Sequence, residues 1–271
     1  EAHQVRIYDN VTWDDSVYPS NPPVLTGQGT SALCMYCHNA RRGPPPAFVS
    51  SGSNATRLPH ESTATDTLLG LRYQTNVQVI VSGSTNSLAS VALKNSAHSG
   101  TAKCVDCHMH QGSNTVGDHT FSMTDRLTDA DNIAACQKCH QNVDDVADFD
   151  HISVISSTLP NGGDYDGNGV VEGVQTEVDG VMAHLETKMQ ATGLIPGASG
   201  PSRWTGYSTN AVTRAVQRTA AWNQFMIERD LSHGVHNTAL TVRILQWSYT
   251  VLSTNTGGNA YSVDFPNADL R

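Results

Sequence analysis

The chain has 271 residues, enough for one large domain or two modest ones, and its formal net charge of -9 argues against a nucleic-acid partner, because phosphate contacts need cations. Hydrophobic residues make up 38% of the chain and aromatic residues only 6%, so the side chains alone predict a thin core. No apolar run approaches the roughly 18 residues that cross a bilayer, and we expect no membrane span.

Residues 1–30 are rich in prolines and turn residues and predict an extended N-terminal arm. The next segment, 31–160, contains every cysteine of the chain in three C-x-x-C-H motifs. They are Cys34-x-x-Cys37-His38, Cys104-x-x-Cys107-His108 and Cys136-x-x-Cys139-His140. In this pattern two thioethers hold the vinyl edges of one porphyrin, and the adjoining histidine reaches its iron. The segment is therefore predicted to be a haem-binding core with three covalently attached haems c.

Other uses of paired cysteines explain this pattern less well. A thioredoxin-like redox motif occurs once, in a βαβ context, and not three times. A zinc ribbon uses its cysteine pairs two by two and would leave one pair unused. Three short-range disulfides would leave the histidine after each pair unexplained. Haem attachment takes place outside the cytoplasmic membrane, so the motifs also predict an extracytoplasmic protein.

Within the core, residues of about 72–95 predict a small β-hairpin insertion. The side chains of 76–81 alternate between polar and apolar, 82–84 is a Ser/Gly turn, and 88–93 is again apolar.

Several histidines outside the motifs are candidates for a second axial ligand. Neutral imidazole is available near pH 7, which makes histidine the commonest ligand of this kind. His98 lies in a Ser/Gly loop before the second motif, and His119 lies in a turn after it. His233 and His236 precede Asn237, whose side chain is suited to cap the following helix. His60 follows a proline and has no evident partner.

The region 161–253 begins with a segment that resembles a calcium-binding loop. Oxygen ligands recur at alternate positions, in the order Asp164, Asp166, Asn168, Val170 (through its carbonyl) and Glu172. Gly169 occupies the sharp-turn position, but Gln175 stands where a calcium loop has a bidentate glutamate. The alternative is an Asp/Gly turn that caps the next helix.

Apolar residues at helical spacing predict three helices, over 174–189, 211–226 and 238–252. The polar segment 254–271 is expected to form a C-terminal tail that stays loose or docks on a neighbouring subunit. The fold class that follows is mainly α, with extensive loops, a small β-hairpin insertion and an interior filled by haem.

The order and spacing of these motifs resemble the haem core of cytochrome c nitrite reductase. They also resemble related multihaem cytochromes, including electron carriers that assemble into extracellular filaments. The similarity covers 30–40 and 95–253 in outline. The resemblance implies a second ligand for each haem: His98 for the His140 haem, His119 for the His38 haem, and His236, with His233 as its rival, for the His108 haem.

Departures from the reductase favour electron transfer over catalysis. The enzyme carries its active haem on a motif that ends in lysine, and every motif here ends in histidine. Two of the enzyme's five haems have no counterpart. We therefore expect an electron carrier, with a small oxidoreductase acting on nitrite or hydroxylamine at an open haem as the alternative.

The expected partners of such a carrier are redox proteins or extracellular electron acceptors. Self-assembly into a filament is a further interpretation, in which His60 ligates a haem of an adjacent subunit; a plain loop position or a propionate contact is the alternative for this residue. With the filament in view, we expect an extracellular or cell-surface location in preference to the periplasm.

Overall fold

The computed structural model describes most of the chain and is mainly helical, with two small two-stranded sheets in its described part. The described residues are 9–12, 24–41, 59–81, 84–110, 117–137, 139–140, 159–197 and 204–271. The predicted fold class, mainly α with a small β-hairpin, is confirmed at this level. Within these residues no helix is both long and apolar enough to cross a membrane.

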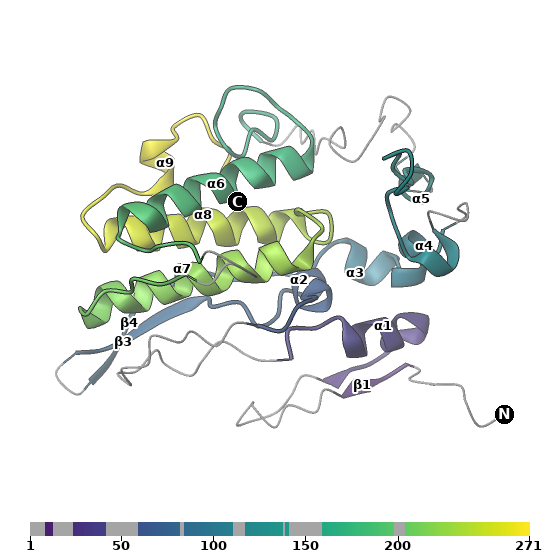
Figure 1. Ribbon diagram of the computed structural model, residues 1–271, viewed down its shortest axis with the longest axis horizontal. Coiled ribbons are helices and arrows are strands. Elements are labelled where there is room, and N and C mark those ends of the chain that lie inside the picture. The colour runs from purple at the N-terminus through teal and green to yellow at the C-terminus, as the bar shows by residue number, and fades with distance from the viewer. Residues whose placement is uncertain are drawn as a thin grey trace.

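Three long helices form one body of the molecule, which we call the helical platform (Figure 1). They are α6 (Val174–Ala191), α7 (Ala211–Asp230) and α8 (Thr238–Thr254), and each pair of them is in contact. The side chains of Leu185, Trp222 and Leu245 are fully buried between them. All three helices that the apolar spacing predicts are thus confirmed, and α7 and α8 begin after asparagine caps.

The segment after α8 packs on its own chain, so the expectation that it stays loose is wrong, and its docking on a neighbouring subunit stays a prediction. It contains the short helix α9 (Tyr261–Asp264), whose Tyr261 is buried beside α8. The Tyr249 hydroxyl donates to Asp264 at 2.6 Å. The backbone of Asp269 donates to the carbonyl of Asp164 at 2.6 Å. Buried aromatic area and specific hydrogen bonds outweigh the polar composition of this segment.

The predicted hairpin is also present, as strands β3 (Asn76–Val81) and β4 (Ser84–Ser90). The strands pair antiparallel with a register shift after Val77, and the hairpin lies against α7 (Figure 1). Val77 and Val79 point into the platform core, while β4 is mostly exposed. This one-sided burial explains the alternation seen in the sequence.

The haem motifs lie in a second region, built from short elements, which we call the motif region (Figure 1). Its elements are β1 (Val11–Thr12), β2 (Val24–Leu25), η1 (Gly29–Ser31), α1 (Ala32–Cys37), α2 (Ala64–Leu69), α3 (His98–Thr101), α4 (Cys104–His108), η2 (Asp118–Thr120) and α5 (Ala134–Gln137). Its buried cluster consists of Val11, Ala32 and Met35. The described part of the N-terminal arm therefore packs on α1, and the rest of the arm lies outside the described residues.

Hydrogen bonds between buried groups join the two regions. The Asn237 amide donates to the carbonyls of Thr67 and Lys94, both at 3.0 Å. The Trp222 indole donates to the carbonyl of Arg72 at 2.9 Å. Because these partners lie in α7 and at the start of α8, the loop between the two helices is held firmly against the motif region.

Candidate haem and cation sites

The cysteines of the first two motifs lie on short helices, in an arrangement that suits two thioether bonds to one macrocycle. In α1 and α4 the two cysteines are three residues apart and therefore share a helix face, and the histidine stands at the C-terminal end. The third motif begins in α5. The motif cysteines and histidines are exposed or half-buried, as attachment to an added group requires.

The three motifs form a continuous cluster. The thiols of Cys34 and Cys104 lie next to each other, and their interaction raises the pKa of Cys34 and lowers that of Cys104. The backbone of Cys104 also donates to Ser31 beside the first motif at 2.9 Å. On the other side, α4 packs on α5, and Cys107 is close enough to Cys136 for their charges to interact. The second motif thus lies between the first and the third.

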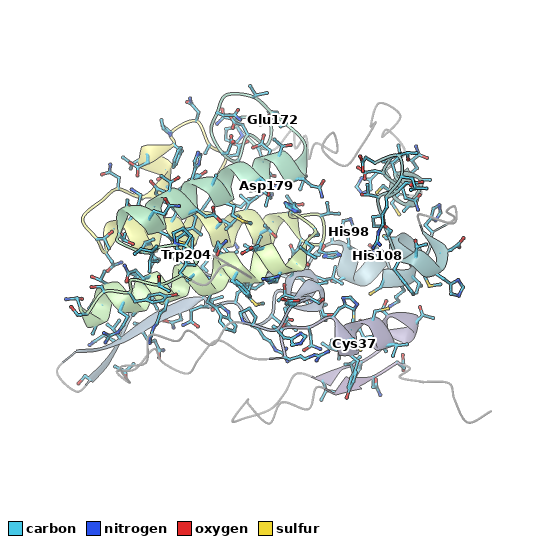
Figure 2. The ribbon with its side chains drawn as sticks, in the orientation of Figure 1. Cys37, His98, His108, Glu172, Asp179 and Trp204 are labelled. Carbon is cyan, nitrogen blue, oxygen red and sulfur yellow. The ribbon has the colours of Figure 1, made fainter. Side chains whose placement is uncertain are left out.

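Two candidate axial ligands face a motif histidine across a gap. The rings of His98 and His140 have centroids 6.2 Å apart. The rings of His108 and His236 have centroids 6.1 Å apart. Figure 2 shows His98 and His108 at the junction of the helical platform and the motif region. In each pair, one histidine belongs to a motif and the other to a distant segment.

These spacings fit one iron between two imidazoles. An imidazole nitrogen binds a first-row transition metal at about 2 Å and lies about 1.2 Å from its own ring centroid, so trans imidazoles on one metal have centroids about 6.3 Å apart. Neither pair is stacked, since the ring planes are inclined by 70° and 45°.

One ring of each pair has a lowered pKa; in the second pair burial lowers the pKa of His236, but the charge and hydrogen bond of Asp230 outweigh it and raise that pKa. Burial, followed by the charge of His140, lowers the pKa of His98. Burial lowers the pKa of His108. Both rings are therefore neutral near pH 7, the state in which imidazole binds a metal. The His108 ring uses Nδ1 to contact the Phe121 carbonyl at 3.1 Å, which leaves Nε2 for the iron.

Of the two rival histidines after α7, the structure brings His236 to His108 and keeps His233 on the surface. His236 Nδ1 is 2.7 Å from Asp230, at the end of α7. His233 has a left-handed backbone with φ of 47°, and its Nδ1 is 2.7 Å from the exposed Asp179 of α6. The intervening Gly234 has φ of 96° and packs so closely on Val178 that a Cβ would collide.

The structure does not pair the remaining candidates. His119, in η2, and His38 are both exposed, and no ring contact joins them within the described residues. His60 lies beside the first motif, because its backbone donates to the carbonyl of Ala40 at 2.7 Å. The His60 ring is exposed, with Nδ1 at 2.8 Å from the Glu61 carbonyl, so its Nε2 faces away from that contact.

The predicted calcium loop brings together Asp164, Asp166 and Glu177, with one carboxylate oxygen of each within 4.8 Å of the others. All three are buried, and no ion pair with lysine or arginine is found for them among the residues that the structure describes. Gly180 of α6 leaves room for Asp166, because a Cβ there would collide with the carboxylate. Burial raises the pKa of Asp166 and of Glu177. Such uncompensated charge suits a cation with a preference for oxygen ligands.

Glu177 corrects the predicted ligand set. It stands in the first turn of α6, two residues beyond the Gln175 position at which a bidentate glutamate was sought. Glu172 lies outside the carboxylate cluster; its carboxylate accepts from the Asn168 amide at 2.9 Å, and its backbone donates to Glu177 at 2.9 Å.

Asn168 and the Val170 carbonyl were the other predicted ligands. The structure shows them in turns of the loop: the Asn168 backbone donates to Asp166 at 3.0 Å, and the Val170 backbone donates to Asn168 at 2.7 Å. A search for any acidic residue in the first turn of the following helix would have found Glu177.

Comparisons with known proteins found no relative of this chain. No protein-family model, no curated protein and no solved structure matches the chain.

Proposed function

We propose that this protein transfers electrons through three covalently attached haems c. The observation that carries the proposal is the pairing of a motif histidine with a distant histidine, at 6.2 Å for His98 and His140 and 6.1 Å for His108 and His236. Each pair of histidines would supply two protein ligands to a haem iron held between them, which would leave no site for a substrate on that iron. Such a centre carries electrons, and the protein supplies attachment, ligands and electrostatics.

Contacts between the motifs support a path through the chain. The first motif touches the second through Cys34 and Cys104, and the second approaches the third through Cys107 and Cys136. His98 also lies close to the carbonyl of Val235, the residue before His236, which acts to raise the pKa of His98. The ligands of two haems are thus neighbours, so three macrocycles held here would lie close together. This arrangement resembles that of multihaem cytochromes.

The purified protein tests the proposal directly. We expect its mass to exceed that of the polypeptide by three haem groups, and its oxidised electron paramagnetic resonance (EPR) spectrum to be dominated by low-spin iron. His98→Ala and His236→Ala should each convert one haem of three to high spin. His184→Ala is the matched control, because His184 stacks on Phe265 in the platform, away from the motifs. A protein without haem, or unchanged spectra in both variants, would contradict the proposal.

A second candidate function rests on the His38 haem. Within the described residues no histidine ring faces His38 at the spacing of the other two pairs. If this iron has an open position, it can bind a small nitrogen compound, and the protein is an oxidoreductase for nitrite or hydroxylamine. A high-spin EPR signal that changes when nitrite is added favours this function. If His119→Ala loses a low-spin signal, His119 is a ligand of this iron. That result would exclude the oxidoreductase function.

Assembly into an extracellular filament is the finer form of the carrier proposal. His60 supports it, because this exposed ring lies beside the first motif with Nδ1 held by a carbonyl, as is usual for metal-binding histidines. Head-to-tail contacts that do not close generate filaments. Electron microscopy should show fibres for the native protein and separate particles for His60→Ala. Fibres that persist in the variant would exclude His60 as the linking ligand.

We also propose that Asp164, Asp166 and Glu177 hold a calcium ion with a structural role. Asp164 and Asp166 lie in a glycine-rich loop, and Glu177 lies in the first turn of α6. The Asp164 carboxylate accepts hydrogen bonds from the backbones of Gly167 at 2.7 Å and Gly169 at 2.9 Å. The C-terminal segment packs on the same loop, so the ion would fasten the chain end to α6.

A further inference from the structure

The carboxylate of Asp230 has a fixed and buried position next to His236. Asp230 is the last residue of α7, and its side chain is 1% exposed. One oxygen is 2.7 Å from His236 Nδ1, and the other accepts a hydrogen bond from the Ser232 hydroxyl. The Ser232 oxygen in turn accepts the backbone N–H of His236 at 3.2 Å. This closed set of hydrogen bonds sets the orientation of the imidazole and requires Nδ1 to be the donor.

The other paired histidines have weaker partners. His108 contacts the Phe121 carbonyl at 3.1 Å, and His98 contacts the Val235 carbonyl. A carbonyl is a neutral acceptor, whereas a carboxylate makes a charge-assisted hydrogen bond. In the part of the chain that the structure describes, His236 is the one paired histidine with a carboxylate partner.

We propose that Asp230 is a positioning residue that lowers the reduction potential of the haem held by His108 and His236. The inference rests on the proposed function, since it requires a haem at this pair. A buried carboxylate draws the Nδ1 proton toward itself, so Nε2 becomes a stronger donor to the iron. A stronger donor stabilises Fe(III) relative to Fe(II) in the one-electron couple, and burial preserves the effect because little water screens the charge.

The position of this haem gives the effect a consequence for electron flow. Its motif lies between the other two, with Cys104 against Cys34 and Cys107 near Cys136. A low potential at the middle centre makes electron transfer uphill in the first half of the path and downhill in the second. Asp230 therefore controls how far the reduction potential of the middle haem lies below those of its neighbours.

Asp230→Asn tests the proposal, because asparagine retains an oxygen acceptor and removes the charge. We expect the ferrous-to-ferric ratio of one haem to rise about tenfold at a fixed applied potential, a shift of about 59 mV for a one-electron couple, in an EPR-monitored redox titration. The other two haems should keep their potentials. Asp179→Asn is the matched control, since Asp179 makes the same 2.7 Å contact with the surface residue His233. It should shift none of the three.

Ser232→Ala provides an independent test with the opposite sign. Removing the hydroxyl concentrates the Asp230 charge on His236, so the same haem should become harder to reduce, which a general loss of structure would not produce. Equal potentials in native protein, Asp230→Asn and Ser232→Ala would overturn the proposal. If Asp230→Asn does not incorporate haem, the proposal is tested by Ser232→Ala alone. A lower reduction potential in that variant supports the proposal, and an unchanged or higher one overturns it.

Failure of the proposed function has a different signature. A native protein that contains no haem, or a His236→Ala variant with an unchanged low-spin spectrum, removes the ligand pair itself. In either case the redox titration of Asp230→Asn is not reached, so the two failures are distinguishable.

Discussion

The helical platform and the motif region differ in how they are held together. The platform buries large apolar side chains such as Trp222, Leu185 and Leu245 between three helices of 17 to 20 residues. In the motif region α1, α4 and α5 have 6, 5 and 4 residues, and the buried cluster centres on Val11, Ala32 and Met35. Helices this short are not stable alone, because each leaves most of its backbone groups unpaired. The platform therefore makes its own core, whereas the motif region is the part that the proposed haems would stabilise.

The largest expected effect comes from removing the haem attachment sites. A chain with all six cysteines replaced by serine should keep the platform folded and lose the motif region. Hydrogen exchange should stay slow in α6, α7 and α8 and accelerate about 1,000-fold in the motif helices, the factor for about 4 kcal/mol of local stability. Persistent protection of α1 and α4 in this chain would show that the motif region folds without haem.

A core truncation sharpens the comparison. Leu245→Ala should reduce the free energy of unfolding of the platform by about 2–5 kcal/mol, because Leu245 is fully buried and leaves a cavity. Denaturant unfolding followed by circular dichroism measures the loss. Leu231→Ala is the control, since Leu231 is 73% exposed and should change stability by less than about 0.5 kcal/mol. Equal effects of the two variants would mean that the platform is not the stable body described.

The acidic loop gives a smaller effect that depends on a single ligand. Glu177→Gln should weaken calcium binding about 10- to 100-fold in isothermal titration calorimetry, because a buried carboxylate that points at the cluster loses its charge. Glu172→Gln should change the affinity less than about threefold, since Glu172 lies outside the cluster. If Glu172→Gln weakened calcium binding more than Glu177→Gln, Glu172 would be the ligand, as the loop spacing alone predicts.

The smallest effect is the pH dependence of the calcium-free protein. Burial raises the pKa of Asp166 and Glu177, so these groups stabilise the fold at pH below their ordinary carboxyl pKa, and this contribution is lost as the pH rises through the raised values. In chelator, wild type should therefore lose stability relative to Glu177→Gln as the pH rises above the ordinary carboxyl pKa, by on the order of 1 kcal/mol. Calcium should abolish the difference in slope, and parallel profiles in chelator would contradict the burial of these charges.

Features whose residues are close in sequence could be predicted, because their geometry is local. The α6, α7 and α8 spacing, the Asn237 cap and the β3–β4 alternation depend on contacts within a few residues. The haem motifs are local in the same sense, and they stay a prediction until haem is measured.

Features that depend on distant partners could not be predicted. The C-terminal segment is polar, and its docking depends on Asp164 and Tyr165, which lie about a hundred residues earlier in the chain, and on Gln246 of α8. Glu177 was missed because helix packing, and not loop spacing, brings it to Asp164. The choice of His236 over His233 follows from the position of Asp230 at the end of α7, which sequence alone does not locate.

The loop that joins α7 to α8 has a consequence for how this protein can vary. Within a few residues it holds Asp230, the His236 ring and the Val235 carbonyl that contacts His98, and Asn237 closes it against the motif region. One added or deleted residue here would displace His236 and the contact to His98 together, the proposed ligands of two irons. Natural variants should therefore tolerate insertions in the β3–β4 turn and keep the length of this loop constant.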